Sequence, residues 1–206
     1  MRNGWVQTFD KNGTSNIFST TNDEFFMESA FVHNDTYFVM EEKPKVANIA
    51  NQLTLSWLYS GSKVQQTPIH EDVKGMYSLT ENKIILLANN TSSTAQVIFY
   101  DVISGGKSTP FNLSSLGKID ACVAISNGLY LVAASGNLTY VDVHNFSTLG
   151  YLSGIVADKL WLDDLTNELY VAHGNSLRVY DYPTRTLKGT YTHPSAITEV
   201  LFWYNK

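Results

Sequence analysis

The sequence predicts an all-β protein built from a repeated unit of about 40 residues. Strand-like runs recur at a near-constant interval, and each third strand ends in a serine or aspartate: Asp10, Ser60, Asp101, Asp142 and Asp181. No window carries a sustained apolar period of 3.6 residues, so almost no helix is expected. Of the 206 residues 44% are hydrophobic, 13% aromatic and only 16% charged. This balance indicates a well-packed, strand-rich chain and excludes a disordered one.

The clearest copies of the repeat are residues 127–142 and 167–181. Both read Asn-x-Leu-Tyr, then aliphatic residues, a Gly/Asn turn, a second apolar run and Asp. Short strands repeating every 40 residues are typical of the blades of a β-propeller, each a four-stranded antiparallel sheet. In the clearest blade we expect strands at 119–125, 129–134, 138–142 and 149–152. Apolar inner strands such as Ile84–Ala88 are expected to be buried between neighbouring blades.

The repeat predicts one propeller domain over residues 1–206. Four full blades are expected at about 22–67, 72–113, 118–152 and 156–191, with partial blades at 1–20 and 195–206. The head resembles the last two strands of a blade, and the tail 196–204 resembles a first strand. Two alternatives follow. Either the ends join to close a ring of about five blades, or the chain is a segment of a larger propeller, completed by a missing segment or a partner.

The segments Leu169–Ala172 and Leu177–Asp181, with their counterparts Leu129–Val132 and Leu138–Asp142, resemble the β-propeller repeats of the YVTN and WD40-like families. Aromatic-Asp pairs such as Tyr180-Asp181 stand where WD40 repeats carry Trp-Asp, whereas the Gly-His dipeptide of those repeats is absent. The resemblance implies the fold and brings no catalytic residue with it.

The formal net charge of −5 argues against a surface for nucleic acid, which needs a basic face. No membrane span is expected because no run of 18 apolar residues occurs. We expect no cofactor, because no phosphate-binding glycine loop is present. The single cysteine, Cys122, lies in an apolar run and is expected to be a small core residue.

Seven Asn-x-Ser/Thr sequons are candidates for glycosylation: Asn12, Asn34, Asn89, Asn90, Asn112, Asn137 and Asn145. Their number favours a secreted glycoprotein. However, Asn, Ser and Thr also gather in hairpin turns for backbone reasons. A secretory or extracellular location and a cytoplasmic one therefore both stay open.

The candidate binding residues lie in the connections between blades: His70, Glu71, Asp72, Asp158 and His193. Such loops border the central channel of a propeller, so the topology predicts that these side chains converge on one face. No metal site is expected, because the histidines lack ligand spacing. Asp163-Asp164 predicts a hairpin turn rather than a calcium loop. The aromatic residues Trp57, Trp161, Trp203 and Tyr204 are expected in the core or between blades.

These observations favour a non-catalytic scaffold that binds other protein subunits in a larger assembly. One alternative is a secreted or cell-surface adhesive, lectin-like propeller, which should repeat an aromatic and polar constellation in every blade. The other is a propeller enzyme, a lyase or hydrolase, which should show histidines and carboxylates of shifted pKa at the channel. A scaffold should instead show an extended contact surface.

Overall fold

The computed structural model describes residues 71–204 with their side chains, and before residue 71 it describes the backbone of six strands. Two of these strands, β1 (Trp5–Phe9) and β2 (Ser15–Ser19), form a two-stranded antiparallel sheet. The other four form one antiparallel sheet: β3 (Phe26–His33), β4 (Thr36–Glu42), β5 (Leu53–Tyr59) and β6 (Ser62–Ile69).

Three further sheets each contain four antiparallel strands in chain order. The first comprises β7 (Asp72–Thr80), β8 (Lys83–Asn89), β9 (Ala95–Asp101) and β10 (Phe111–Asn112). The second comprises β11 (Ile119–Ser126), β12 (Leu129–Ala134), β13 (Asn137–Asp142) and β14 (Ser147–Ser153). The third comprises β15 (Lys159–Asp163), β16 (Glu168–His173), β17 (Ser176–Asp181) and β18 (Thr186–Thr192).

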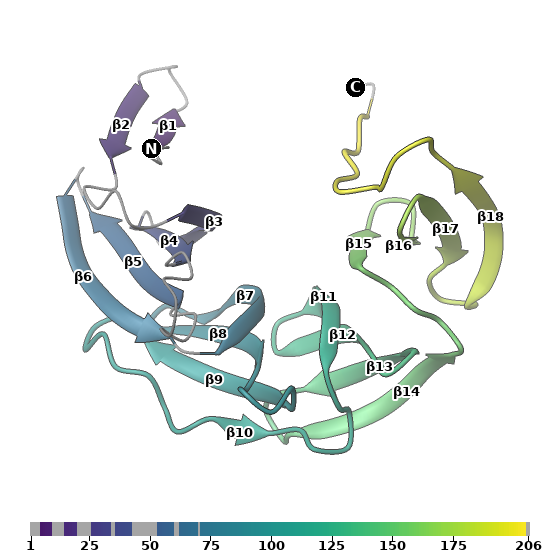
Figure 1. Ribbon diagram of the computed structural model, residues 1–206, viewed down its shortest axis with the longest axis horizontal. Helices are drawn as coiled ribbons and strands as arrows, with labels where there is room; N and C mark the ends of the chain where they lie inside the picture. The colour runs from purple at the N-terminus through teal and green to yellow at the C-terminus, as the bar shows by residue number, and fades with distance from the viewer. Residues whose placement is uncertain are drawn as a thin grey trace.

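The three sheets stand side by side along an arc, with β7, β11 and β15 on its inner side and β10, β14 and β18 on its outer side (Figure 1). Residues 71–204 form no helix, and so nothing in that range could cross a membrane as a helix. This confirms the predicted all-β class with four-stranded antiparallel blades. The strands predicted around residues 119–152 are confirmed almost to the residue.

In the three blades whose side chains are described, the second strand is the most buried. In β8 every side chain from Ile84 to Ala88 is fully buried, as predicted for a strand between two neighbouring blades. In β12 the side chains from Tyr130 to Ala134 are buried as well. These runs form the apolar layers that hold each blade against the next, and burial of such side chains is the main stabilising contribution.

The aspartates that end the third strands have a structural role in turns. Asp101 accepts hydrogen bonds from the amide (2.7 Å) and the hydroxyl (2.8 Å) of Ser104. Asp181 accepts the same pair from Thr184, at 2.9 Å and 2.5 Å. These bonds lower the pKa of both carboxyl groups. The repeated aspartate therefore caps a turn, as Asx and ST motifs do.

The turns that begin at Asp101, Asp142 and Asp181 each place their fifth residue in the left-handed region of φ. The φ angle is +68° at Gly105, +55° at Phe146 and +62° at Arg185. Only the first of these is glycine, so the other two positions carry some backbone strain. Phe146 offsets it by stacking on Phe111 of the preceding blade, with ring centroids 3.9 Å apart.

One buried amide joins two blades directly. The side chain of Asn89 is 2% exposed. Its Oδ1 accepts a hydrogen bond from the Ile119 amide at 2.7 Å, and its Nδ2 donates to the Ile119 carbonyl at 2.8 Å. Asn89 thus substitutes for a backbone partner at the start of β11, where an unpaired amide would be costly.

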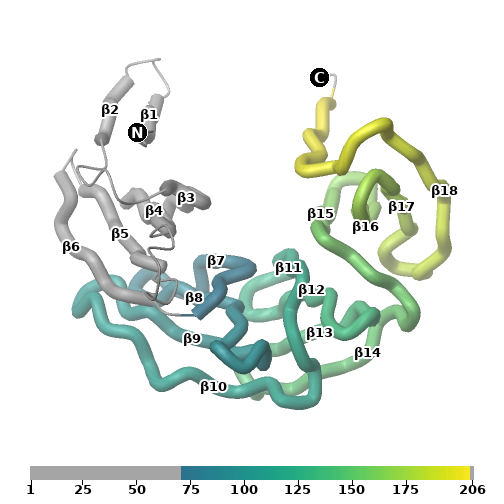
Figure 2. The backbone as a smooth tube through the Cα atoms, in the orientation of Figure 1, coloured from purple at the N-terminus to yellow at the C-terminus, as the bar shows by residue number. Residues whose placement is uncertain are grey.

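The tail after β18 forms no strand, which corrects the prediction for 196–204. It still lies along the last blade, since the Ile197 amide donates to the Gly174 carbonyl at 2.9 Å and the ring of Phe202 lies 5.1 Å from that of Tyr170. Figure 2 shows the chain returning from β18 toward the inner side of the arc, near β15. A strand needs a hydrogen-bonded neighbour, and the tail has none among the described residues.

Candidate functional site

The first strands of three blades meet around a cavity of about 350 Å³ at the mouth of the channel. The cavity is bordered by the beginnings of β7, β11 and β15, which the propeller topology brings together although they lie some 40 residues apart in sequence. Its lining mixes charged and apolar groups: Val73, Lys74, Asp120, Ala121, Cys122, Asp158, Lys159 and Leu160.

The five predicted site residues are placed differently from one another. Asp158 lines the cavity, and Asp72 directly precedes two of its lining residues. Glu71 is turned to Lys107, with both carboxylate oxygens 3.2 Å from Nζ. His193 bonds locally to the backbone and hydroxyl of Ser195 at 3.1–3.2 Å. His70 lies outside the described residues. Of the four described candidates, the structure places Asp158 in the cavity lining, whereas Asp72, Glu71 and His193 are not among the lining residues.

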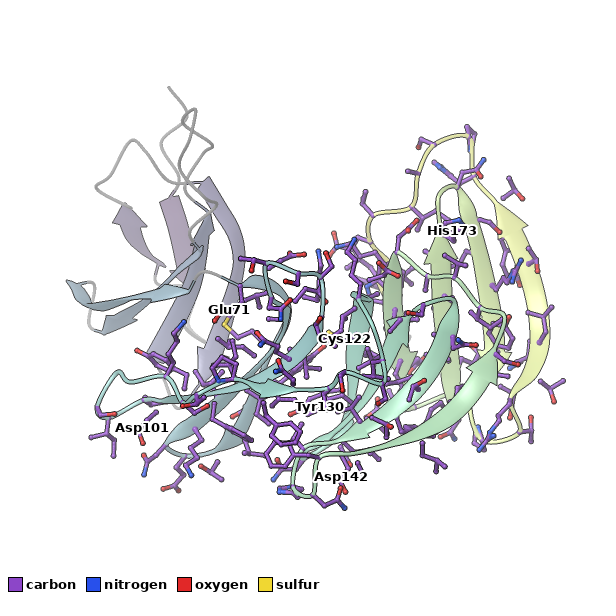
Figure 3. All side chains as sticks on the ribbon, turned by 60° about the horizontal axis from the view of Figure 1, so that its bottom comes forward. Glu71, Asp101, Cys122, Tyr130, Asp142 and His173 are labelled. Carbon is purple, nitrogen blue, oxygen red and sulfur yellow. The ribbon has the colours of Figure 1, made fainter. Side chains whose placement is uncertain are left out.

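The partner of Asp158 was not predicted. Its Oδ2 accepts a hydrogen bond from the Gly174 amide at 2.6 Å and lies 3.2 Å from Nδ1 of His173. The bond from Gly174 and then that from His173 lower the pKa of this carboxyl group. A sequence signal exists in retrospect, because hairpin pairing of β15 with β16 sets residue 158 opposite 173. In Figure 3, His173 lies at the opposite rim from Asp101 and Asp142.

Ion pairs neutralise much of the charge at this mouth. Nζ of Lys74 lies 2.9 Å from Asp72, and Nζ of Lys118 lies 3.7 Å from Asp120. The carboxylate of Asp158 stays ionised at neutral pH, because the hydrogen bond from the Gly174 amide lowers its pKa. Such groups bind and orient polar partners, whereas a general acid needs a raised pKa.

Cys122 lines the same cavity without being reactive. Its Sγ accepts a hydrogen bond from the Tyr77 hydroxyl at 3.4 Å, and burial raises the pKa of the thiol to about 11. The group is therefore a neutral thiol at pH 7 and a poor nucleophile. It packs against the core between the two blades, as the apolar run predicted. Between residues 71 and 204 no His, Cys, Asp and Glu side chains gather in a metal-holding group of three.

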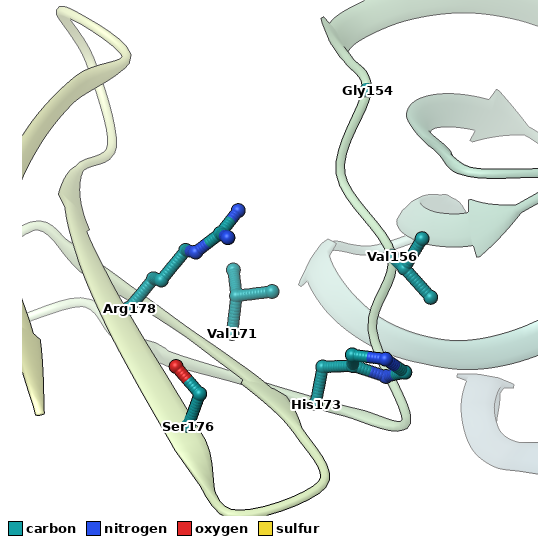
Figure 4. Close-up of a pocket in the computed structure, with 6 residues that line it drawn as sticks. All are labelled: Gly154, Val156, Val171, His173, Ser176 and Arg178. Carbon is teal, nitrogen blue, oxygen red and sulfur yellow. The ribbon is translucent and has the colours of Figure 1, made fainter. Parts of the chain in front are cut away.

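A second, smaller pocket of about 150 Å³ lies between the last two blades (Figure 4). Val171 and His173 of β16 stand opposite Arg178 and Ser176 of β17 on one face of the sheet. Val156 of the β14–β15 connection faces them across the pocket. His173, the partner of Asp158, also lines this pocket.

The described sequons differ in accessibility. The amide of Asn89 is buried and occupied by Ile119, so it is out of reach of a glycan in the folded chain. Asn137 and Asn145 donate their Nδ2 groups within their own turns, to Ser135 and Asp142. The side chains of Asn90 and Asn112 act as acceptors. Asn90 Oδ1 accepts hydrogen bonds from the Ser92 and Thr94 amides. Asn112 Oδ1 accepts one from Gln96 Nε2 at 2.7 Å. Asn12 and Asn34 lie outside the described residues.

The prediction for the aromatic residues of the tail is wrong in one respect. Trp203 is 89% exposed and Tyr204 is 44% exposed, so neither is buried in a core. Trp161 is partly buried, and Trp57 has no described side chain. The predicted hairpin turn at Asp163-Asp164 is confirmed, with Asp163 accepting the Leu165 amide at 3.0 Å.

Comparison with solved structures places this architecture. The chain is similar to the WD40 β-propeller domain of Doa1, with 12% identity and a TM-score of 0.52 over 93% of this chain and 76% of that one. The fold is a β-propeller. The chain is also similar to Sqt1 of Saccharomyces cerevisiae, with 11% identity and a TM-score of 0.62 over 96% of this chain and 60% of that one. A third similar structure is the glutaminyl cyclase of Myxococcus xanthus, with 17% identity and a TM-score of 0.52 over 81% of this chain and 70% of that one.

The likeness extends to the fold alone. No protein-family model and no curated protein matches the sequence, and the YVTN resemblance stays a prediction. The chain spans between 27% and 76% of the length of these and other similar propeller structures. All of the described strands therefore fit a segment of a β-propeller.

Proposed function

We propose that this chain is a non-catalytic interaction module that acts as one component of a larger protein assembly. The observation that carries the proposal is the distribution of exposed apolar side chains. Of ten large apolar side chains exposed in the described part of the chain, five belong to β18 and the tail: Leu187, Tyr191, Leu201, Trp203 and Tyr204. Half of the exposed large apolar side chains thus belong to the last strand and the tail, and exposed apolar surface of this kind supports protein contacts there.

The channel mouth supports binding rather than catalysis. Asp72 and Asp120 are ion-paired with lysines. The hydrogen bond from the Gly174 amide lowers the pKa of Asp158. Its thiol is neutral at pH 7 because burial raises the pKa of Cys122. The enzyme alternative requires a group poised to accept or give a proton near neutral pH. We therefore propose the cavity around Asp72 and Asp158 as a second contact area for polar partner groups.

The adhesive alternative requires a repeated exposed aromatic beside polar groups. Among the described residues, exposed aromatics occur at Phe111, Tyr191, Trp203 and Tyr204. Phe111 is stacked on Phe146, and the other three belong to the last blade and tail, so no blade repeats the arrangement of another. This distribution supports one protein-binding edge over several equivalent sugar sites.

The proposal is tested by the size of the particle that contains the chain in an extract of its source cells. Size-exclusion chromatography with immunodetection should show a particle well above the 23.0 kDa of the chain. The variant Leu201→Asp/Tyr191→Asp should shift the signal to the position of the isolated chain, because it places charges at two of these exposed apolar positions. A wild-type chain that elutes as a 23.0 kDa monomer from the extract contradicts the proposal.

A further inference from the structure

We propose that the pocket between the last two blades binds one side-chain carboxylate, from an aspartate or glutamate of a partner protein, with Arg178 as its counter-ion. That a partner protein supplies this group rests on the proposed function. That the pocket takes a carboxylate follows from its unpaired guanidinium, its apolar wall, its size and the charge around it.

The guanidinium of Arg178 has no counter-ion. Within residues 71–204 this side chain makes no ion pair, hydrogen bond or ring contact. The other arginine of that range, Arg185, donates to the Tyr151 carbonyl at 3.2 Å and lies over the Tyr151 ring. A guanidinium is always charged in proteins, and its fork of donors matches the two oxygens of a carboxylate. Arg178 is therefore free to bind an anion.

The pairing of β16 with β17 places the groups of the pocket on one face of the last blade. Arg178 is opposite Val171, and Ser176 is opposite His173. Because side chains alternate across a strand, Arg178 and Ser176 extend on the same side of β17, as Figure 4 shows. The Ser176 hydroxyl also has no hydrogen-bond partner in the part of the chain whose side chains are described. A guanidinium and a hydroxyl thus stand next to each other as unused donors.

The remaining walls suit an aliphatic stem. Val171 lines the pocket and is 2% exposed, and Val156 faces it from the β14–β15 connection with 49% of its surface exposed. The His173 ring is held at the rim by Asp158, whose Oδ2 lies 3.2 Å from Nδ1. A side chain with an apolar stem and a charged end can lay its methylene groups on the valines while its end reaches Arg178.

The volume of the pocket selects a single side chain. It measures about 150 Å³, which is the size of an engineered cavity that holds one benzene molecule. Pockets for drug-sized ligands and cofactors measure about 300–1,000 Å³. The space therefore suits one acidic side chain of a larger protein rather than a complete small-molecule ligand.

The charge around the pocket favours a carboxylate over a phosphate group. One guanidinium balances one negative charge, and the carboxylate of Asp158 is bound to the same His173 ring that lines the pocket. A phosphate ester carries a charge of about −1.5 to −2 at neutral pH, so Asp158 would repel it more strongly. The formal net charge of −5 acts in the same direction. A carboxylate carries a single charge and can accept two parallel bonds from Arg178.

The probe is the peptide acetyl-Ala-Val-Glu-Val-Ala-amide, in which the glutamate is the only charged group. It is titrated into the isotope-labelled full chain and followed by NMR of the backbone amides. We expect saturable shifts confined to residues 154–156 and 171–178, which contain the pocket. The dissociation constant should be about tenfold higher for a peptide with glutamine in place of glutamate, and also for Arg178→Gln.

Lys159→Gln is the matched control variant. It removes the same charge from the same blade, but Lys159 lines the channel cavity rather than this pocket. We expect it to leave the affinity within about twofold, because exposed charges outside the contact contribute little. Arg178 is exposed, so Arg178→Gln should fold like the wild type.

Saturable binding that needs both the glutamate and Arg178, and does not need Lys159, supports the proposal. No saturation up to about 10 mM peptide overturns it. Equal binding of the glutamine peptide assigns the pocket to apolar contacts, and equal weakening by Lys159→Gln assigns the binding to overall charge. Tighter binding of a phosphoserine peptide assigns the pocket to phosphate. Each of these three results also overturns the proposal, while a large particle in the cell extract would still leave the proposed function standing.

Discussion

Replacing Gly75 by alanine should destabilise the chain at the contact between its first strands. A Cβ atom at Gly75 would lie 2.5 Å from Sγ of Cys122 and 2.6 Å from the ring of Tyr77. Neither neighbour has room to move, because the ring of Tyr77 packs 4.7 Å from that of Tyr130 and its hydroxyl bonds to the same sulfur. Overpacking of this kind costs about 1–3 kcal/mol.

Part of that cost is offset. Alanine in a strand is favoured over glycine by about 0.5–1 kcal/mol, because the unfolded chain loses less backbone freedom. The net loss for Gly75→Ala is then about 0–2.5 kcal/mol, centred on about 1 kcal/mol. A chain of this size loses about 2–4 °C in Tm for each kcal/mol, so the central value predicts a fall of about 2–4 °C.

Urea unfolding and calorimetry measure this effect, with Gly150→Ala as the matched control. Gly150 lies in β14 with no atom within 4 Å of the position its Cβ would take, so this variant should be neutral or slightly more stable. In a Cys122→Ala background, Gly75→Ala should cost less, because the sulfur is removed. Equal stabilities for Gly75→Ala and Gly150→Ala would refute the close approach of β7 and β11.

Three further predictions concern turns and contacts between blades. Asn89→Ala should lower the free energy of unfolding by about 3 kcal/mol, because it leaves the buried amide and carbonyl of Ile119 without partners. An unchanged midpoint of urea unfolding would contradict the two hydrogen bonds between Asn89 and Ile119. Asp101 and Asp181 have lowered pKa values, so their stabilisation is complete above the ordinary value of 3.8 and is lost as pH falls through the lower folded values. The variant Asp101→Asn/Asp181→Asn should therefore lose less Tm than the wild type between about pH 5 and about pH 2, and parallel curves would count against the turn bonds. Asn167 has a φ of +55°, so Asn167→Gly should change stability by less than about 0.5 kcal/mol and Asn167→Val should cost about 1–2 kcal/mol; the opposite order would exclude the left-handed turn.

Local signals explain how well the strands could be predicted. The predicted strand 129–134 matches β12 (Leu129–Ala134), because Asn127-Gly128 starts its hairpin and the apolar run fixes its length. Gly128 has a φ of +77°, as that turn requires. The burial of Ile84–Ala88 was likewise predictable, since a continuous apolar run cannot face water on either side.

Contacts between blades could not be predicted in the same way. The approach of Gly75 to Cys122 depends on a register shift in β7 between Val73 and Gly75. The clamp of Asn89 on Ile119 likewise joins β8 to the first strand of the next blade. Hydrophobic periodicity places residues on faces, but it carries no information on bulges or on the neighbouring blade.

Trp203 shows a further limit of the sequence. Its strand-like context predicts an apolar, packed residue, and the alternation is present in the tail. Whether a neighbouring sheet exists to cover it is a property of the assembly rather than of the local pattern. The exposed side chain is thus where the prediction and the structure differ.

Hydrogen exchange of the backbone amides in the isolated chain tests the central claim most directly. If the propeller is open and its tail is an unpaired first strand, amides 198–204 exchange at the rate of an unprotected peptide, while those of β8 and β12 are strongly protected. If amides 198–204 are instead as protected as those of β15, the tail is already paired within the chain. That result would contradict the unpaired backbone of the tail.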